Sequence, residues 1–241
     1  GEENIAGLSA PTEEGLLYEV DTKLRPSGSK GPVAVRFSSF ERYYAEEAWT
    51  WELLALTRLR PVAGDLAFGK RVLDVAHAAI LRLRDYEKTK RDVIEMRALM
   101  ERERTGRGVW DLKLAAGGFV DIEFVAQALQ LISAKREVLA SNTGEAIERL
   151  TRAGVLASDV GHELQAAFGL YSDLNQLLRM SVGAGVNPEA WPAPLKARLA
   201  GLDSVETFEA LEAHLRQIQA RVRSIFLDLI GDGPAGVARL D

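Results

Sequence analysis

Residues 66–85, LAFGKRVLDVAHAAILRLRD, carry a clear helical signal. The apolar residues of this stretch recur three or four positions apart, which is typical of a helix that buries one face. Asp65 directly precedes the stretch and is a suitable N-cap. The sequence therefore predicts a helix over residues 66–85, with an apolar stripe of Val72, Leu73, Ala76, Ala79, Ile80 and Leu83.

The same helical signal continues to residue 231. A glycine-containing break at 105–118 interrupts it, Gly154 and Gly231 are expected helix stops, and an Asp203…Glu206 pair is an expected helix start. The predicted helices after the first are 87–104, 119–135, 143–153, 158–182, 189–200 and 204–230.

The sequence before residue 38 has a different period. Residues 16–25 alternate apolar and charged side chains, and Val33, Val35 and Phe37 alternate again after a Pro26–Pro32 loop. Period-two alternation predicts two strands of a β-hairpin. A Ser38…Glu41 capping box then predicts a helix that runs to about residue 59, because Pro61 cannot continue it. The expected fold is mainly α, with a β-hairpin followed by an α-helical bundle.

Composition excludes several classes of protein. The 241 residues are 47% hydrophobic and 27% charged, an ordinary globular mixture. The chain has no cysteine and three scattered histidines, which argues against disulfides, thiolate chemistry and a His-based metal site. A net charge of −5 argues against nucleic-acid binding, and the chain carries neither a long apolar run for a membrane nor a signal peptide. The expected compartment is the cytoplasm.

Several charged residues near the predicted hairpin could handle phosphate. Asp21, Lys23 and Arg25 would share one strand face. One interpretation is a carboxylate that holds a divalent metal beside cations that neutralise phosphate, and the other is a solvated strand face, which the pattern alone favours. Lys30 lies in the glycine-containing loop, where backbone N–H groups could approach phosphate, although a plain hairpin loop is the simpler interpretation. Arg58 and Arg60 end the next helix, where cations also suit the helix dipole.

A second polar cluster lies at residues 111–123, DLKLAAGGFVDIE. A pair of glycines here would permit close approach of the backbone to another group. Acidic residues in the first turn of a helix are also expected from the helix dipole alone, and this interpretation is favoured without further information. The candidate residues are Asp111, Lys113, Asp121 and Glu123.

Taken in order, three long strings resemble the glutamine synthetase adenylyltransferase family: LLYEVDTKLRPSGSKGPVAV, FERYYAEEAWTWELLALTRLRPVAGD and WDLKLAAGGFVDIEFVAQALQL. They span about residues 16–131. The resemblance implies an enzyme with two nucleotidyltransferase halves, one that transfers AMP from ATP to a tyrosine of glutamine synthetase and one that removes it by phosphorolysis. The EAWTWE stretch resembles the adenylylating half, and the deadenylylating half is the alternative.

The resemblance also implies roles for the candidate residues. Asp21 matches the third of three metal-holding carboxylates, so Mg²⁺ and ATP are the implied ligands. Lys23, Arg25, Lys30, Arg58 and Arg60 would line the phosphate side. The Asp-x-Asp that supplies the other two carboxylates does not precede Asp21. We therefore expect a partial nucleotidyltransferase domain at 1–63, inactive by itself, an α-helical domain at 64–231 and a disordered tail at 232–241.

The motif with Asp111, Lys113, Asp121 and Glu123 is expected to stitch the helical domain to the nucleotidyltransferase sheet, or else to approach the nucleotide. The implied partner is glutamine synthetase, and a PII-type signal protein is a further candidate. The competing hypothesis is a non-catalytic helical module that binds the target enzyme or a regulator. Self-association through an apolar face, left exposed where sheet strands are missing, is also consistent with the sequence.

Overall fold

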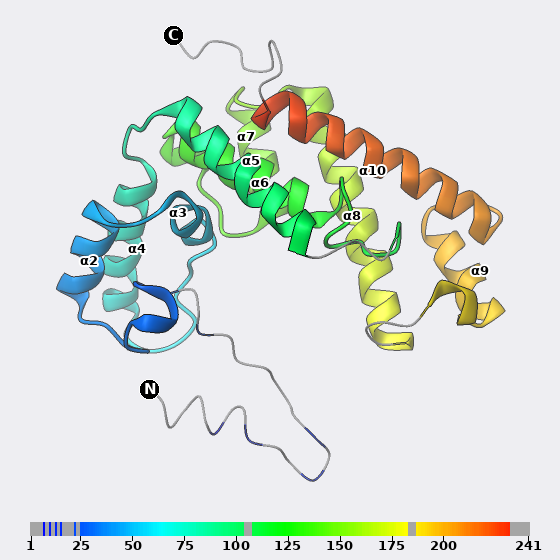
Figure 1. The fold of residues 1–241 in the computed structure, drawn as a ribbon, viewed down its shortest axis with the longest axis horizontal. Helices are drawn as coiled ribbons and strands as arrows, with labels where there is room; N and C mark the ends of the chain where they lie inside the picture. The colour runs from blue at the N-terminus through cyan, green and yellow to red at the C-terminus, as the bar shows by residue number, and fades with distance from the viewer. Residues whose placement is uncertain are drawn as a thin grey trace. The chain divides into compact units, whose positions relative to one another are not determined.

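The computed structural model describes residues 25–103, 108–182 and 187–231, together with residues 7, 10, 13, 15 and 22. Within these residues the chain forms nine α-helices, three short 3₁₀ helices and no β-strand (Figure 1). The prediction of a mainly α protein is therefore confirmed. The chain divides into two compact units, residues 1–80 and 81–241, which are taken in turn.

The first unit contains the 3₁₀ helix η1 (Gly28–Lys30) and the helices α2 (Phe37–Glu46), α3 (Thr50–Leu56) and α4 (Leu66–Ile80), with α4 packed against both α2 and α3. The predicted strand over Val33–Phe37 is wrong, because residues 33–36 are irregular and Phe37 begins a helix. Most of the other predicted strand, 16–25, lies outside the described residues. Alternating side chains favour a strand only where neighbouring strands pair with it, and residues 33–36 have no such partner among the described residues.

The predicted helix from residue 38 to about 59 is in fact two helices. The N–H groups of Glu47 and Ala48 both donate to the Tyr43 carbonyl, at 2.8 and 3.0 Å, which closes α2. A new helix then begins after Trp49, whose N–H donates to the Glu52 carboxylate at 2.9 Å. The capping interaction therefore joins Trp49 and Glu52 at the start of α3. The predicted cap at Ser38 is not formed, because no side chain caps α2.

Helix α4 begins as predicted and ends early. The Phe68 N–H donates to the Asp65 carboxylate at 2.8 Å, which confirms the predicted cap. Ala76, Ala79 and Ile80 of the predicted stripe are buried, but Leu83 lies beyond the helix and is exposed. The helix ends at Ile80, and Asp85 caps the following helix by accepting the Lys88 N–H at 3.0 Å.

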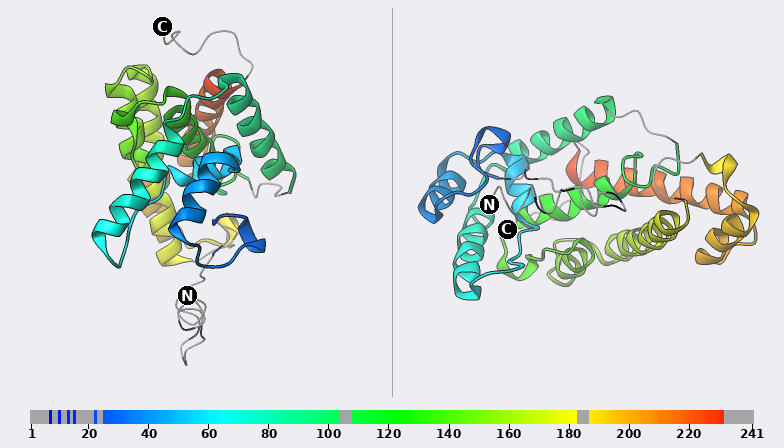
Figure 2. Two further views of the ribbon diagram at one scale, coloured as in Figure 1. Left: turned by 90° about the vertical axis from the view of Figure 1, so that its left-hand side faces the viewer. Right: turned by 90° about the horizontal axis from the view of Figure 1, so that it is seen from below.

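The second unit is a helical bundle with α6 (Phe119–Ser133) at its centre. Helix α6 packs against α5 (Tyr86–Glu103), α7 (Thr143–Arg152), α8 (Ser158–Ser181) and α10 (Phe208–Ile230). Ten of its fifteen residues are buried. Helix α9 (Ala193–Leu202) packs on α8 and α10 at one end of the unit (Figures 1 and 2). Two short 3₁₀ helices, η2 (Arg136–Val138) and η3 (Pro188–Ala190), connect the longer elements.

Helix boundaries in this unit follow local hydrogen bonds. Gly154 follows α7 with φ 69°, and α10 stops before Gly231, both as predicted. The predicted Asp203…Glu206 start of the last helix is wrong. The Thr207 hydroxyl caps α10 by accepting the Ala210 N–H at 3.1 Å, because Asp203 instead pairs with His214 at 2.5 Å. The predicted tail 232–241 lies outside the described residues.

None of the helices that the structure describes is both long enough and apolar enough to span a bilayer.

Candidate functional site

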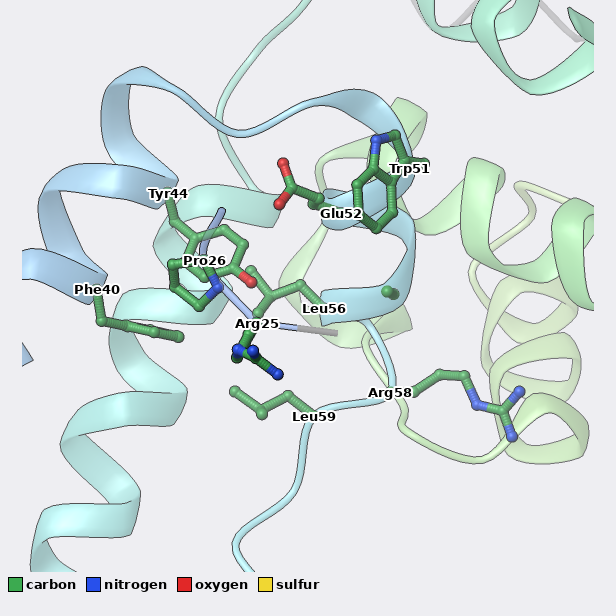
Figure 3. Close-up of a pocket in the computed structure, with 10 residues that line it drawn as sticks. Arg25, Pro26, Phe40, Tyr44, Trp51, Glu52, Leu56, Arg58 and Leu59 are labelled. Carbon is green, nitrogen blue, oxygen red and sulfur yellow. The ribbon is translucent and has the colours of Figure 1, made fainter. Parts of the chain in front are cut away.

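A pocket of about 360 Å³ in the first unit lies between the 25–31 loop and helices α2 and α3 (Figure 3). It combines aromatic walls with a buried carboxylate and two guanidinium groups. Its lining residues are Arg25, Pro26, Phe40, Tyr44, Trp51, Glu52, Ala55, Leu56, Arg58 and Leu59. The sequence candidates Arg25 and Arg58 therefore line one pocket, whereas Lys30 and Arg60 are not among its lining residues.

The Arg25 side chain stabilises the 25–31 loop through hydrogen bonds. Its Nε and Nη2 donate to the Gly31 carbonyl at 3.2 and 3.1 Å, and its Nη1 donates to the carbonyl and hydroxyl oxygens of Thr22. A Cβ on Gly31 would lie 2.4 Å from the Pro26 carbonyl oxygen, so only glycine fits this turn. Four hydrogen bonds thus engage the guanidinium within the loop, and its positive charge lies at the pocket wall.

Glu52 connects the two helices beside the pocket. Its side chain is 4% exposed. One carboxylate oxygen accepts from the Tyr43 hydroxyl at 2.7 Å, and the other accepts from the Trp49 N–H at 2.9 Å. A buried carboxylate needs such donors, because an unsatisfied one would carry a large desolvation cost.

The two neighbouring tyrosines are held in their neutral form. Burial raises the pKa of Tyr43, and its hydrogen bond to Glu52 raises this pKa further. Burial raises the pKa of Tyr44 to about 12, with an added contribution from the negative charge of Glu52. Both phenols therefore remain protonated at neutral pH, and Tyr43 can donate to Glu52.

The remaining cationic candidates are exposed. Lys30 ends η1, and Arg58 and Arg60 follow α3. In the close-up, the Arg58 side chain extends away from Arg25 (Figure 3). The structure therefore places the guanidinium groups of Arg25 and Arg58 along one pocket, Arg58 at its exposed side, and does not bring Lys30 or Arg60 to it.

Asp21 and Lys23, the predicted metal ligand and its neighbour, lie outside the described residues. Across the residues that are described, no three Asp, Glu or His side chains gather closely enough to hold a metal ion. The described residues therefore do not form a ligand set for Mg²⁺, and the metal-holding role of Asp21 stays a prediction.

One residue of the second predicted cluster, Asp121, belongs to a buried ionic network in the second unit. The Asp121 side chain is completely buried. It accepts from the Arg97 Nε, from the Gly117 N–H at 2.7 Å and from an Arg223 Nη at 3.2 Å. Glu101 pairs with both arginines, at 3.3 and 3.0 Å. Two carboxylates thus balance two guanidinium groups, which is the condition under which buried charges are tolerated.

This network joins α5, α6, α10 and the segment before α6. Arg97 also donates to the carbonyl oxygens of Leu114 and Ala115, each at 3.1 Å. The Tyr171 hydroxyl donates to the Gly117 carbonyl at 2.9 Å, which adds α8. Burial raises the pKa of Tyr171, and the charge of Asp121 raises it further, so this donor stays protonated. The hydrogen bonds and ion pairs of Asp121 thus hold helices of its own unit together.

The other three members of the cluster lie apart from this network. Asp111 accepts the Leu114 N–H at 3.1 Å and so stabilises a turn before α6. Lys113 is exposed, and Glu123 is half-buried on α6. The structure therefore separates Asp121, a buried network residue, from three residues nearer the surface.

Comparisons with known proteins match both units. A family described as "Glutamate-ammonia ligase adenylyltransferase" matches residues 1–75, and one described as "GlnD PII-uridylyltransferase" matches residues 90–230. The chain is 51% identical over 92% of its length to the bifunctional glutamine synthetase adenylyltransferase/adenylyl-removing enzyme of Caulobacter vibrioides. It is 40% identical over 95% of its length to the protein of the same name from Agrobacterium fabrum.

The chain belongs to the glutamine synthetase adenylyltransferase family. It spans 23% of the Caulobacter protein and 24% of the Agrobacterium protein, about a quarter of each. The two family matches fall within the two compact units of this chain, which agrees with a division near residue 80.

Sequence reasoning missed four structurally central residues of this adenylyltransferase family member: Tyr43, Glu52, Arg97 and Arg223. Two signals could have found some of them. Trp49 and Glu52 have the spacing of a helix start and its third residue. Arg97 lies four residues after the buried Val93, so it continues an apolar stripe, where an arginine needs a buried anionic partner. The tertiary position of Arg223 has no comparable local signal.

Proposed function

We propose that this chain is part of an enzyme that transfers the AMP group of ATP to a tyrosine of glutamine synthetase. The observation that carries the proposal is the 40–51% identity, over more than nine tenths of the chain, to proteins named for this activity. In the reaction, the tyrosine oxygen forms a bond to the α-phosphorus and pyrophosphate leaves. Such a reaction depends mainly on positioning and on neutralising phosphate charge.

We assign the phosphate side of this site to the first unit. Asp21 is the proposed carboxylate for a Mg²⁺ ion that accompanies ATP, and Lys23, Arg25, Lys30, Arg58 and Arg60 are the proposed cations. Supporting this, Arg25 and Arg58 line one pocket, and the loop that carries Arg25 and Lys30 is held in one shape by hydrogen bonds. The EAWTWE stretch favours the adenylylating half of the family over the half that removes AMP.

We assign a supporting role to the second unit, with the Asp121 network as its internal brace. Glutamine synthetase is the proposed partner, with a PII-type signal protein as a proposed regulator. Regulation of nitrogen assimilation in the cytoplasm follows from that assignment.

A segment exchange tests the proposal. The corresponding segment of the Caulobacter vibrioides enzyme is replaced by this chain, and the exchanged enzyme is assayed with glutamine synthetase. We expect AMP transfer from ATP to be retained, while phosphate-dependent AMP removal by the other half is unaffected. A folded exchanged enzyme that removes AMP normally but cannot transfer it would contradict the proposal. If transfer is retained and AMP removal is lost, this chain belongs to the other half.

A non-catalytic helical module is the second candidate. It is favoured by the second unit, which has its own buried core and its own balanced ionic network. Calorimetry of the 241-residue chain with Mg-ATP distinguishes the adenylyl-transferring site from the non-catalytic module. Tight binding supports a nucleotide site within this chain. If the chain does not bind Mg-ATP but forms a complex with glutamine synthetase, the result supports the module.

A further inference from the structure

We propose that the ion pair between Asp203 and His214 is a pH-sensitive latch on the turn between α9 and α10. The turn, residues 203–207, follows the last residue of α9, and His214 lies in the second turn of α10. A protonated imidazole pairs with the Asp203 carboxylate as a cation, whereas a neutral imidazole offers only a hydrogen bond. The latch should therefore hold the turn more firmly below neutral pH than above it, independently of the proposed AMP transfer.

The two side chains of the latch are in direct contact. The Nδ1 of His214 lies 2.5 Å from a carboxylate oxygen of Asp203. The Asp203 side chain is 13% exposed and that of His214 is 45% exposed, so the carboxylate is largely shielded from water while the imidazole can exchange its proton with solvent. Histidine is the side chain whose ordinary change of charge falls between about pH 5 and 8. The strength of this pair should therefore change within that range.

The end of α9 has no cation of its own. No basic residue lies in the last turn of the helix. The N–H of Asp203 donates to the Ala200 carbonyl at 3.2 Å, so Asp203 brings His214 to the carbonyl end of α9. A cation at this end of a helix is stabilised by the helix dipole. Protonated His214 thus supplies, from α10, a charge that the sequence of α9 lacks.

The turn itself is strained. Ser204 has φ 56°, a left-handed conformation that residues other than glycine rarely adopt. The Val205 N–H closes the turn by donating to the Ala200 carbonyl at 3.2 Å. On the other side of the latch, α10 is anchored by Leu211 and Leu215, which are both fully buried. The turn, rather than α10, should therefore loosen when the pair weakens.

The other charged groups that share a pocket with the latch keep their charge near neutral pH. Asp203 and His214 line a pocket of about 390 Å³ together with Glu163 of α8 and Arg221 of α10. Glu163 and Arg221 pair with each other through two hydrogen bonds, at 2.5 and 3.1 Å. Carboxylates and guanidinium groups ordinarily stay ionised between about pH 5 and 8. The pH response is therefore assigned to His214, and a loosened turn would open this side of the pocket.

Hydrogen exchange of the 241-residue chain at about pH 5.5 and about pH 8 tests the latch. The measured quantities are the protection factors of the Ser204 and Val205 amides, which correct for the intrinsic effect of pH on exchange. In the unmodified chain we expect these factors to be about three- to fivefold lower at the higher pH. His214→Gln should give the lower protection at both pH values. His214→Lys, which stays charged, should remove the pH dependence.

His162→Gln is the matched control, because His162 is the other histidine of the second unit, is exposed on α8 and does not line the pocket. This substitution should leave the pH dependence of the turn unchanged. Equal protection of the turn amides at both pH values would overturn the proposal, as would a pH dependence that survives in His214→Gln. A fall in protection that extends equally to the amides of α8 would mean a global change in stability, and would also overturn it.

Discussion

Replacing Asp121 by asparagine should strongly destabilise the second unit. The carboxylate is fully buried and receives Arg97, the Gly117 N–H and Arg223. An amide keeps the size but loses the charge, and its NH₂ group would face these donors. Removing one partner of a buried ion pair costs about 3–5 kcal/mol, because the other charge is left uncompensated. Domains are stable by only about 5–15 kcal/mol, so this loss is a large fraction of the total.

Urea unfolding of the 241-residue chain measures this loss in the free energy of unfolding. Hydrogen-exchange mass spectrometry of α5, α6 and α10 shows where in the unit the structure is destabilised. With a slope of about 2 kcal/mol per molar urea, the midpoint should fall by roughly 1.5–2.5 M. Glu163→Gln is the matched control, because it breaks the exposed pair with Arg221 and should cost about 0.2–1 kcal/mol. A second substitution, Arg97→Met, should add little to Asp121→Asn, since the two residues act as one unit. A loss below about 1 kcal/mol for Asp121→Asn would refute the reasoning.

Three further changes test other parts of the structure. Gly117→Ala should severely destabilise the chain, because its Cβ would lie 1.7 Å from the Gln219 carbonyl oxygen. Gly154 also has a positive φ but lies in open space, so Gly154→Ala should cost only about 1–2 kcal/mol in thermal unfolding. Thr207→Ala should cost about 1 kcal/mol by removing the cap of α10, and the exposed Glu206→Gln beside it should be nearly neutral in the same assay. The pKa of Tyr44 is raised to about 12, so its neutral form is favoured by folding; this stabilisation is fully present below pH 10 and should be lost as pH rises through about 12. The difference in tyrosinate absorbance between the unmodified chain and Tyr44→Phe should then titrate near pH 12, and a midpoint near 10 would contradict the burial of Tyr44.

The helices were predictable because each depends on local pattern. The α4 cap at Asp65 and the stops at Gly154 and Gly231 are set by residues within a few positions of the helix ends. The apolar stripe of α4 was predictable for Ala76, Ala79 and Ile80 but not at Leu83, which lies between the end of α4 and the Asp85 cap of the next helix.

The errors arose where distant contacts override local pattern. The alternation of Val33, Val35 and Phe37 favours a strand, but Phe37 begins α2 and packs its ring near Phe68 of α4, with centroids 5.7 Å apart. The break between α2 and α3 depends on a glutamate six residues beyond the helix end, which binds back to Trp49 and Tyr43. Sequence spacing singled out Asp121, but its partner Arg223 lies 102 residues away, and no local pattern connects the two.

The proposed metal-holding role of Asp21 is tested by the AMP-transfer rate of the segment-exchanged enzyme carrying Asp21→Asn. The control for loss of a carboxylate in the same unit is Glu41→Gln, at an exposed position. We expect Asp21→Asn to abolish transfer of AMP from ATP to glutamine synthetase while the enzyme stays folded, and the Glu41→Gln enzyme to transfer AMP normally. Undiminished transfer by the Asp21→Asn enzyme would contradict this role.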